Sequence, residues 1–278
     1  MGFAKYQEDI VSRFIGDNAM RGAKVPVLPP KPAEPTPPAR QINNQSEQRN
    51  QKMSSLKKFA VAAPRPLPVI ILADVSGSMG ENGKIEALNA AMKEMIATFA
   101  KENRLRAEIQ LALITFGGTA QMHLPLVAAH SVTALADLNA DGATPMGAAF
   151  ELARQLLEDK NLIPSRAYRP VLILLSDGQP TDDWEVPFKA LCTSERAQKA
   201  SRLVMAIGSD ADETMLCDFA NDPEAPIFKA HNARDIHRFF RAVSMSVTIR
   251  TTSQNPALST AFVVPPPDDD DALDLDFS

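Results

Sequence analysis

From Leu67 onward, short apolar runs alternate with segments of helical periodicity, and this alternation restricts the fold more than any other feature of the chain. Apolar runs of this length, bounded by Pro, Gly or Asp, are typical of buried strands. Strands that alternate with helices are joined by crossovers, which make them parallel neighbours in one sheet. The sequence therefore predicts an α/β fold with a doubly wound, mostly parallel sheet that has helices on both faces.

Six strands and five helices are expected. The strands are predicted at 68–74, 109–116, 120–126, 170–176, 202–208 and 226–229. The helices are predicted at 84–102, 145–159, 183–200, 212–220 and 232–248. Gly117-Gly118 predicts a hairpin between the second and third strands, so one antiparallel strand is expected at an edge of the sheet.

The chain is predicted to hold one compact domain between two dissimilar ends. Residues 1–66 carry 11 Lys or Arg against 5 acidic residues, and residues 26–38 contain seven prolines, which predicts a basic, semi-rigid arm. The domain is expected at 67–250. Residues 251–278 are predicted to be a disordered acidic tail, because 268–278 contain six Asp and no basic residue.

A short amphipathic helix is predicted near 6–15, where Ile10, Val11, Phe14 and Ile15 share one helical stripe. A helix this short is marginal on its own. It either docks onto its own domain or serves as a partner-binding peptide on the proline-rich tether, and the sequence leaves both alternatives open.

Charge and cysteine content exclude several classes of protein. The formal net charge is −5, and the basic residues concentrate in the arm, which argues against a specific nucleic-acid ligand for the domain. Cys192 and Cys217 have no Cys-x-x-Cys companion, so reduced thiols are expected instead of a zinc cluster or a disulfide framework. No apolar run is long enough to span a membrane and the start lacks a signal core, so we expect a cytoplasmic location.

Oxygen-bearing side chains follow two of the predicted buried strands. Asp74, Ser76 and Ser78 come directly after the first, Thr144 precedes a helix, and Asp177 ends a later strand. Ligands of open α/β sheets gather beyond the carboxyl ends of the strands. Carboxylates and hydroxyls are ligands that Mg²⁺ accepts, so these residues are the candidate metal ligands.

Asp-x-Ser-x-Ser, followed along the chain by Thr and then Asp, resembles the metal-ion-dependent adhesion site of von Willebrand factor A domains. Arg169–Trp184, with Ile114–Gly117 before it and Phe239–Ser246 after it, is similar to the bacterial TerY-like tellurium-resistance branch. The similarity covers roughly Leu67 to Arg250 and leaves both ends of the chain unexplained.

The resemblance implies a role for each ligand. Ser76 and Ser78 would bind the ion directly, and Thr144 would bind it in the ligand-competent state. Asp74 and Asp177 would bind directly or through water. The sixth position would stay open for an Asp or Glu of a protein partner, with Mg²⁺ as the expected ion and Mn²⁺ or Ca²⁺ as alternatives.

The resemblance also implies a binding module instead of an enzyme, in a bacterial stress, tellurium-resistance or defence assembly. Relatives of this branch are associated with a protein kinase and a phosphatase. The oligomeric state is not predicted.

Each candidate ligand also has a purely structural interpretation. Thr144 before Pro145 is a good N-cap with Pro at the first helical position. Ser76 and Ser78 would satisfy backbone groups of a tight turn, and Asp177 with the following Gly would form a turn.

The acids after Asp177 are better explained by helix capping than by metal binding. Asp182 with Glu185 three residues later predicts a capping box, and Asp183 would favour the same helix start. Trp184 either anchors this helix by packing or contacts ligands beside the site. Asp141 is predicted to be a turn residue, and the four histidines show no ligand spacing.

Two other functions compete with metal-dependent binding. A strand-terminal Asp such as Asp74 also begins Mg²⁺-dependent phosphoryl-transfer enzymes, but these need a second acid where this chain has Ser76. A metal-independent scaffold is the other alternative. The acidic tail, in which Leu273, Leu275 and Phe277 alternate with Asp, is either a docking peptide or a source of a carboxylate for the open metal position.

Overall fold

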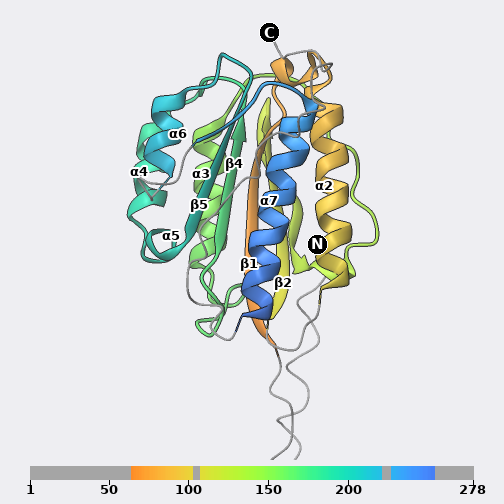
Figure 1. The fold of residues 1–278 in the computed structure, drawn as a ribbon. Helices are drawn as coiled ribbons and strands as arrows, with labels where there is room; N and C mark the ends of the chain where they lie inside the picture. Colours follow the sequence, from red (N-terminus) through yellow and green to blue (C-terminus); the bar gives the residue numbers. More distant parts are fainter. Residues whose placement is uncertain (1–63, 103–106, 221–226, 254–278) are drawn as a thin grey trace, which may run out of the picture. The chain divides into compact units, whose positions relative to one another are not determined.

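The computed structural model describes residues 64–102, 107–220 and 227–253 (Figure 1). The chain divides into two units, Met1–Ala60 and Val61–Ser278, and all described residues belong to the second. The predicted helix near 6–15 lies outside the described residues, and so does the predicted acidic tail at 251–278 apart from its first three residues.

Six strands form one sheet in the order β3-β2-β1-β4-β5-β6. Their bounds are Arg65–Asp74 (β1), Ala107–Gly117 (β2), Thr119–Ala128 (β3), Val171–Ser176 (β4), Ser201–Ile207 (β5) and Phe228–Ala230 (β6). Only the β2–β3 pair is antiparallel, and its hairpin turns at Gly118, whose φ is +62°. The doubly wound sheet, the strand count and the antiparallel edge strand are therefore confirmed.

The described part of the chain also contains six α-helices and two short 3₁₀ turns. Their bounds are Gly77–Gly80 (η1), Lys84–Lys101 (α2), Ala129–Ser131 (η2), Met146–Glu158 (α3), Glu185–Thr193 (α4), Glu195–Lys199 (α5), Glu213–Phe219 (α6) and Ala233–Thr252 (α7). The helix predicted at 183–200 is wrong in one respect, since it breaks at Ser194, whose φ and ψ are −65° and 144°. Thr193 Oγ1 donates to Lys189 O at 2.7 Å, and such a bond to the carbonyl four residues earlier slightly destabilises and often bends a helix.

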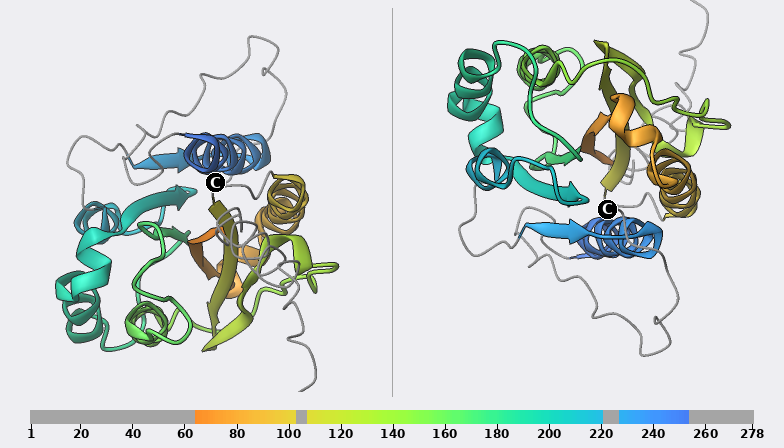
Figure 2. Two further views of the ribbon diagram at one scale, coloured as in Figure 1. Left: turned by 90° about the horizontal axis from the view of Figure 1, so that it is seen from below. Right: turned by 90° about the horizontal axis from the view of Figure 1, so that it is seen from above.

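The sheet has a separate hydrophobic core on each face. Along β1, Val69, Ile71 and Ala73 pack on the side of α2 and α7, whereas Ile70 and Leu72 pack on the side of α3. This alternation follows from the two-residue period of a strand. Figures 1 and 2 show α2 and α7 covering one face of the sheet, with α3 to α6 on the other. Burial on both faces explains why the central strands are almost continuously apolar.

The strand order reverses between β1 and β4, and this reversal positions the candidate site. The chain leaves β1 through α2 on one face and leaves β4 through α4 on the other, so the two loops diverge at the carboxyl edge. Ala73 pairs with Leu175, which brings the ends of the two strands side by side. Ligand sites of open α/β sheets form at such reversals.

Within the ranges that the structure describes, none of the helices combines the length and apolar character needed to cross a membrane.

Candidate metal centre

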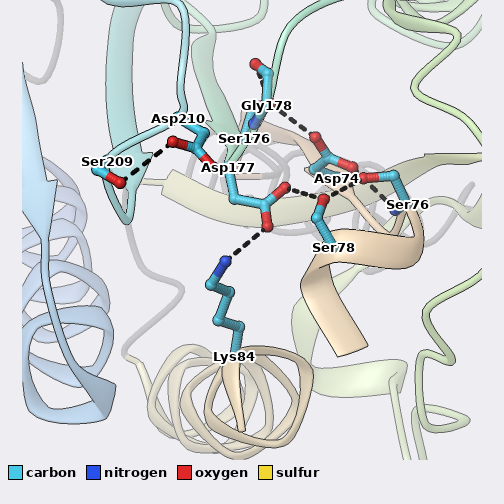
Figure 3. A network of polar contacts seen from close by, with 9 residues as sticks. All are labelled: Asp74, Ser76, Ser78, Lys84, Ser176, Asp177, Gly178, Ser209 and Asp210. Atoms are coloured by element: carbon cyan, nitrogen blue, oxygen red, sulfur yellow. Dashed lines mark hydrogen bonds and ion pairs between the residues drawn. The ribbon is translucent and has the colours of Figure 1, made fainter. Parts of the chain in front are cut away.

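Asp74 is the innermost carboxylate of the predicted site. It is the last residue of β1 and is fully buried. Ser176 Oγ donates to Asp74 Oδ2 at 2.6 Å, and the backbone N–H of Ser76 donates to Oδ1 at 2.9 Å (Figure 3). Both carboxylate oxygens are therefore held in place by neighbours from β4 and from the loop after β1.

The pKa of Asp74 is raised from 3.8 to about 6, chiefly because burial disfavours the charged form. Hydrogen bonds from Ser176 and Ser76 lower the pKa, and the negative charge of Asp177 raises it further. Keeping Asp74 ionised at neutral pH thus costs folding free energy. A cation beside this carboxylate would offset that cost.

Ser76, Ser78 and Asp177 continue the same polar network. The hydroxyl oxygens of Ser76 and Ser78 lie 3.2 Å apart, and Ser78 Oγ donates to Asp177 Oδ1 at 2.8 Å. The 3₁₀ turn η1 presents both serines from one side of the loop, with Met79 N donating to Ser76 O at 3.0 Å. Four of the five predicted ligands are therefore joined by contacts among themselves (Figure 3).

Lys84 is a member of the network that the sequence analysis missed. Its Nζ lies 3.0 Å from Asp177 Oδ2, and the two side chains are 11% and 0% exposed. Lys84 is the first residue of α2, where the helix dipole disfavours a cation. The sequence did contain a signal for this contact, because a lysine stands at the start of the helix that follows Asp-x-Ser-x-Ser. The helix dipole disfavours a positive charge there, and an acidic partner compensates for this.

Thr144, the fifth predicted ligand, lies in the loop before α3. This loop is fixed beside the serine turn by backbone hydrogen bonds, from Gly77 N to Gly142 O and from Asp141 N to Val75 O, both 2.9 Å. Thr144 is buried, with 6% of its surface exposed. The contacts of the described residues include no hydrogen bond from its hydroxyl to the other four ligands, so its loop is adjacent while its side chain is not joined to the network.

Glycine makes this approach of loops feasible. Gly142 has φ of +73°, and a Cβ there would lie 2.5 Å from Gly118 Cα. Any other residue would force apart the loop of the β2–β3 hairpin and the loop that carries Thr144.

Thr144 does not cap α3, so that structural alternative is wrong. The N-cap is Pro145, without a side-chain cap bond, and Thr144 N is instead bonded to Thr181 Oγ1 at 2.9 Å. The predicted capping box of Asp182 with Glu185 is also wrong. Asp182 accepts hydrogen bonds from Gly147 N at 2.9 Å and from Ala148 N at 3.0 Å, and so caps α3 from the neighbouring loop.

The reason for both corrections lies in the packing of the loop after β4. A Cβ on Gly147 would meet Trp184 Cα at 2.7 Å, so only glycine lets the loop lie against the first turn of α3. Trp184 itself is half-buried and packs edge-on against Phe188, with ring centroids 5.4 Å apart. Cys192 and Cys217 are free thiols on α4 and α6.

The donor chemistry of the network fits a hard divalent cation. The candidate ligands are carboxylate and hydroxyl oxygens, which Mg²⁺, Mn²⁺ and Ca²⁺ accept. Over the described ranges no three His, Cys, Asp or Glu side chains gather as a metal-binding group. Two carboxylates with three hydroxyls are still a suitable ligand set for such a cation, because hydroxyl oxygens can fill coordination positions that additional acids would otherwise fill.

Comparison with known proteins agrees with this fold. Residues 69–179, which include all five candidate ligands, match the family model described as von Willebrand factor type A domain. No curated protein is significantly similar in sequence to the chain.

Solved structures with the same fold are distant in sequence. A von Willebrand factor type A protein from Catenulispora acidiphila superposes with a TM-score of 0.53 at 22% identity, over 66% of this chain and 42% of that one. Proximal thread matrix protein 1 from the mussel byssus gives 0.51 at 20% identity, over 70% and 51%. A structure of the same mussel protein with a zinc-occupied MIDAS motif gives 0.52 at 19% identity, over 70% and 51%.

The chain thus spans about half or less of the length of these proteins, and likeness at such identities shows the fold alone. The sheet order, the Asp74 network at the strand reversal and the match of residues 69–179 agree with one another: over these residues the chain is similar to the von Willebrand factor type A domain.

Proposed function

We propose that this domain is a metal-dependent protein-interaction module that binds an acidic side chain of a partner. The observation that carries the proposal is the network of Asp74, Ser76, Ser78 and Asp177, whose oxygens meet at the carboxyl edge of the sheet. Thr144 would complete the ligand set from the adjacent loop. Mg²⁺ is the proposed ion, and Mn²⁺ and Ca²⁺ are alternatives.

The side chains of the network would contribute in different ways to binding such an ion. Asp74 is oriented by Ser176 and Ser76, and Asp177 is oriented by Ser78 and Lys84. The hydroxyls of Ser76 and Ser78 bring oxygen lone pairs without adding charge. A bound divalent cation would supply a Lewis-acidic position toward solvent.

The charge balance of the site favours an anionic partner. The two carboxylates offset a divalent ion, and Lys84 adds a further positive charge next to Asp177. A loaded site would therefore carry net positive charge, which attracts an Asp or Glu from outside and disfavours a Lys or Arg. The proposed partner is a protein that presents such a carboxylate.

Two further observations support this function. Von Willebrand factor A domains are generally interaction modules and not enzymes. The mussel structure with a zinc-occupied MIDAS motif documents metal in a domain of this fold. As a setting, we propose a bacterial cytoplasmic assembly for stress or tellurium resistance or for defence, with a kinase and phosphatase pair as candidate partners, on the resemblance of Arg169–Trp184 to the TerY-like branch.

The experiment is a pull-down with the tagged full chain, in buffer with Mg²⁺ and in buffer with chelator. We expect Mg²⁺-dependent retention of a partner that Asp74→Ala abolishes, because this variant removes the innermost ligand. Ser209→Ala is the matched control, since Ser209 is exposed and its hydroxyl donates to Asp210 Oδ1 at 3.2 Å, away from the four joined ligands (Figure 3). Replacing the partner's contacting Asp or Glu with Asn or Gln should also abolish retention.

Equal retention in chelator and in Mg²⁺, unaffected by Asp74→Ala, would contradict the proposal. That outcome would favour the metal-independent scaffold.

A further inference from the structure

An open groove of about 660 Å³ lies at the end of the sheet opposite to the candidate metal centre. It is formed by the segment between α3 and β4 together with α5. Tyr168 N bonds to Pro66 O at 2.7 Å and Ser201 N bonds to Pro170 O at 2.9 Å, which places the groove at the amino ends of the strands. The metal centre is at their carboxyl ends, so the two sites are spatially separate.

Basic side chains dominate the lining of this groove. Lys160, Arg169, Arg196 and Lys199 line it, and Glu195 is the acidic residue among the lining residues. Glu195 is bonded to Lys199 at 2.6 Å, and both side chains are largely exposed. The lining therefore carries an excess of positive charge.

The guanidinium groups of the groove are held by backbone carbonyls. Arg169 Nε donates to Lys199 O, and Arg196 donates to Leu157 O at 3.0 Å and to Ile163 O. A carbonyl fixes the orientation of a guanidinium but does not cancel its charge. These contacts leave two oriented positive groups at the groove, a suitable arrangement for carboxylates.

Nearby residues add to the positive field. Arg250 donates to Arg169 O at 2.8 Å, and its pKa is lowered to about 10, first by burial and then by repulsion from Arg169. Arg65 lies 4.0 Å over the ring of Tyr168. Glu158, which accepts from the backbone N of Arg196 at 3.2 Å, is an acid at this end, and Asp159 follows it in the chain.

The lining of the groove also includes apolar residues. Ile163, Pro164 and Tyr168 are among them, with Ile163 and Tyr168 largely buried. A matching ligand therefore combines several carboxylates with apolar side chains at short spacing.

The carboxyl-terminal segment of this chain has that composition. Residues 268–278 contain six Asp, and Leu273, Leu275 and Phe277 alternate with acids. The described structure ends just after α7, whose Arg250 contacts Arg169 at the groove. Fourteen residues, 254–267, separate this end from the acidic segment, and a chain of that length can bridge about 20 Å, so the segment starts within reach of the groove.

We propose that residues 268–278 dock into this basic groove of their own chain. The inference goes beyond the proposed function and does not depend on metal binding. Its consequence is that six carboxylates are held at the opposite end of the sheet from the Asp74 network, where they do not compete with a partner's acid.

Carbodiimide cross-linking of the full chain tests the proposal directly. The reagent activates an Asp carboxylate, and a lysine amine within contact then forms an amide bond as the urea by-product leaves. We expect Lys160 and Lys199 to be joined to Asp residues of 268–278 in the monomeric fraction, as identified by mass spectrometry. Tail cross-links confined to lysines of residues 1–66, or to Lys84, would overturn the proposal, and so would the absence of any tail cross-link.

A fluorescent peptide of residues 265–278, titrated with the chain that lacks 268–278, gives a second measurement. Lys160→Glu with Lys199→Glu should weaken binding at least tenfold, whereas Lys93→Glu with Lys101→Glu, on exposed positions of α2, should change it less than twofold. Unfolding temperatures of both variants confirm that the domain remains folded. Equal effects of the two pairs would overturn the proposal.

Two controls separate this docking from its rivals. A peptide with Ser at 273, 275 and 277 should bind at least fivefold more weakly, and equal binding would reduce the interaction to charge alone and contradict docking against the apolar residues of the lining. Binding should also persist in chelator and in the Asp74→Ala variant. Loss under either condition would show that the tail is a metal ligand, which also overturns the proposal.

Discussion

Lys84 Nζ and Asp177 Oδ2 form a nearly buried ion pair, 3.0 Å long, at the edge of the candidate metal centre. Asp177 would be a ligand of the divalent ion, yet both of its carboxylate oxygens already have a partner. Lys84 places a permanent positive charge beside Oδ2, and Ser78 Oγ donates to Oδ1. The pair stabilises the folded domain without metal, and the same ammonium repels an incoming cation. Stability without metal and affinity for metal are thus opposed at this residue.

Lys84→Met is expected to separate these two effects. In chelator the variant should lose about 3 kcal/mol of unfolding free energy, because Asp177 is left buried without its partner. The rise in unfolding temperature on adding Mg²⁺ should be larger than in the wild type. Thermal unfolding with and without Mg²⁺ measures both quantities.

Lys93→Met is the matched control, because Lys93 pairs with Asp137 through half-exposed side chains and such pairs contribute less than about 1 kcal/mol. If Mg²⁺ raises the unfolding temperature of Lys84→Met no more than that of the wild type, Lys84 does not weaken the affinity for metal, and the account of this residue is wrong.

Asp74 predicts a specific pH dependence of the chelated protein. Its folded pKa of about 6 lies above the unfolded value of 3.8, so its contribution is fully present below 3.8 and is lost as the pH rises through 6. The loss is on the order of 3 kcal/mol. Asp74→Asn should remove this fall, and at pH 7 in chelator it should be more stable than the wild type by about 1–3 kcal/mol.

Urea unfolding of both proteins between pH 4 and pH 7.5 in chelator measures this difference, in which the titration of all other groups cancels. A difference between the two proteins that does not change with pH would show that the pKa of Asp74 is not raised.

Asp182→Ala is expected to destabilise α3 and the loop that carries Thr144. The substitution removes the two hydrogen bonds from Gly147 N and Ala148 N, which should cost about 1–2 kcal/mol. Asp183→Ala, at the exposed neighbouring position, should cost less than about 0.5 kcal/mol. Urea unfolding of the two variants checks the contrast, and equal losses would argue against capping of α3 by Asp182.

Gly142→Ala is expected to weaken the metal centre without altering any ligand. A Cβ at this position would clash with Gly118, and the positive φ adds strain of about 1 kcal/mol or more. The loop with Thr144 should move away from the serine turn, and the Mg²⁺-induced rise in unfolding temperature should fall by more than half. Gly83→Ala is a demanding control, since it also has a positive φ but no atom within 4 Å of the added Cβ.

A Mg²⁺ response retained in Gly142→Ala, or lost equally in Gly83→Ala, would show that the close approach of the loops is not what supports the site.

Most of the fold follows from local pattern. The apolar runs that became β1 and β4 are buried on both faces, so their composition alone identifies them as central parallel strands. The hairpin was predictable from Gly117-Gly118 because turn chemistry is local. The break at Ser194 was not predicted, since the sequence on both sides of it continues one helical pattern.

The candidate site could be predicted only in part from the sequence. Asp74 ends β1, Ser76 and Ser78 follow it directly, and strand adjacency brings Asp177 to them, so their proximity follows from topology. The role of Asp182 depends on contact between two loops that are distant in sequence, and a capping pattern cannot reveal which helix it caps. The Lys84–Asp177 pair is also a tertiary contact.

Calorimetric titration of the full chain with Mg²⁺ tests the central claim most directly. The account predicts saturable binding of one ion per chain, weakened at least tenfold by Ser76→Ala with Ser78→Ala, while Ser209→Ala retains wild-type affinity. No saturable binding of Mg²⁺, Mn²⁺ or Ca²⁺, or equal affinity in the double serine variant, would contradict a divalent cation held by these oxygens.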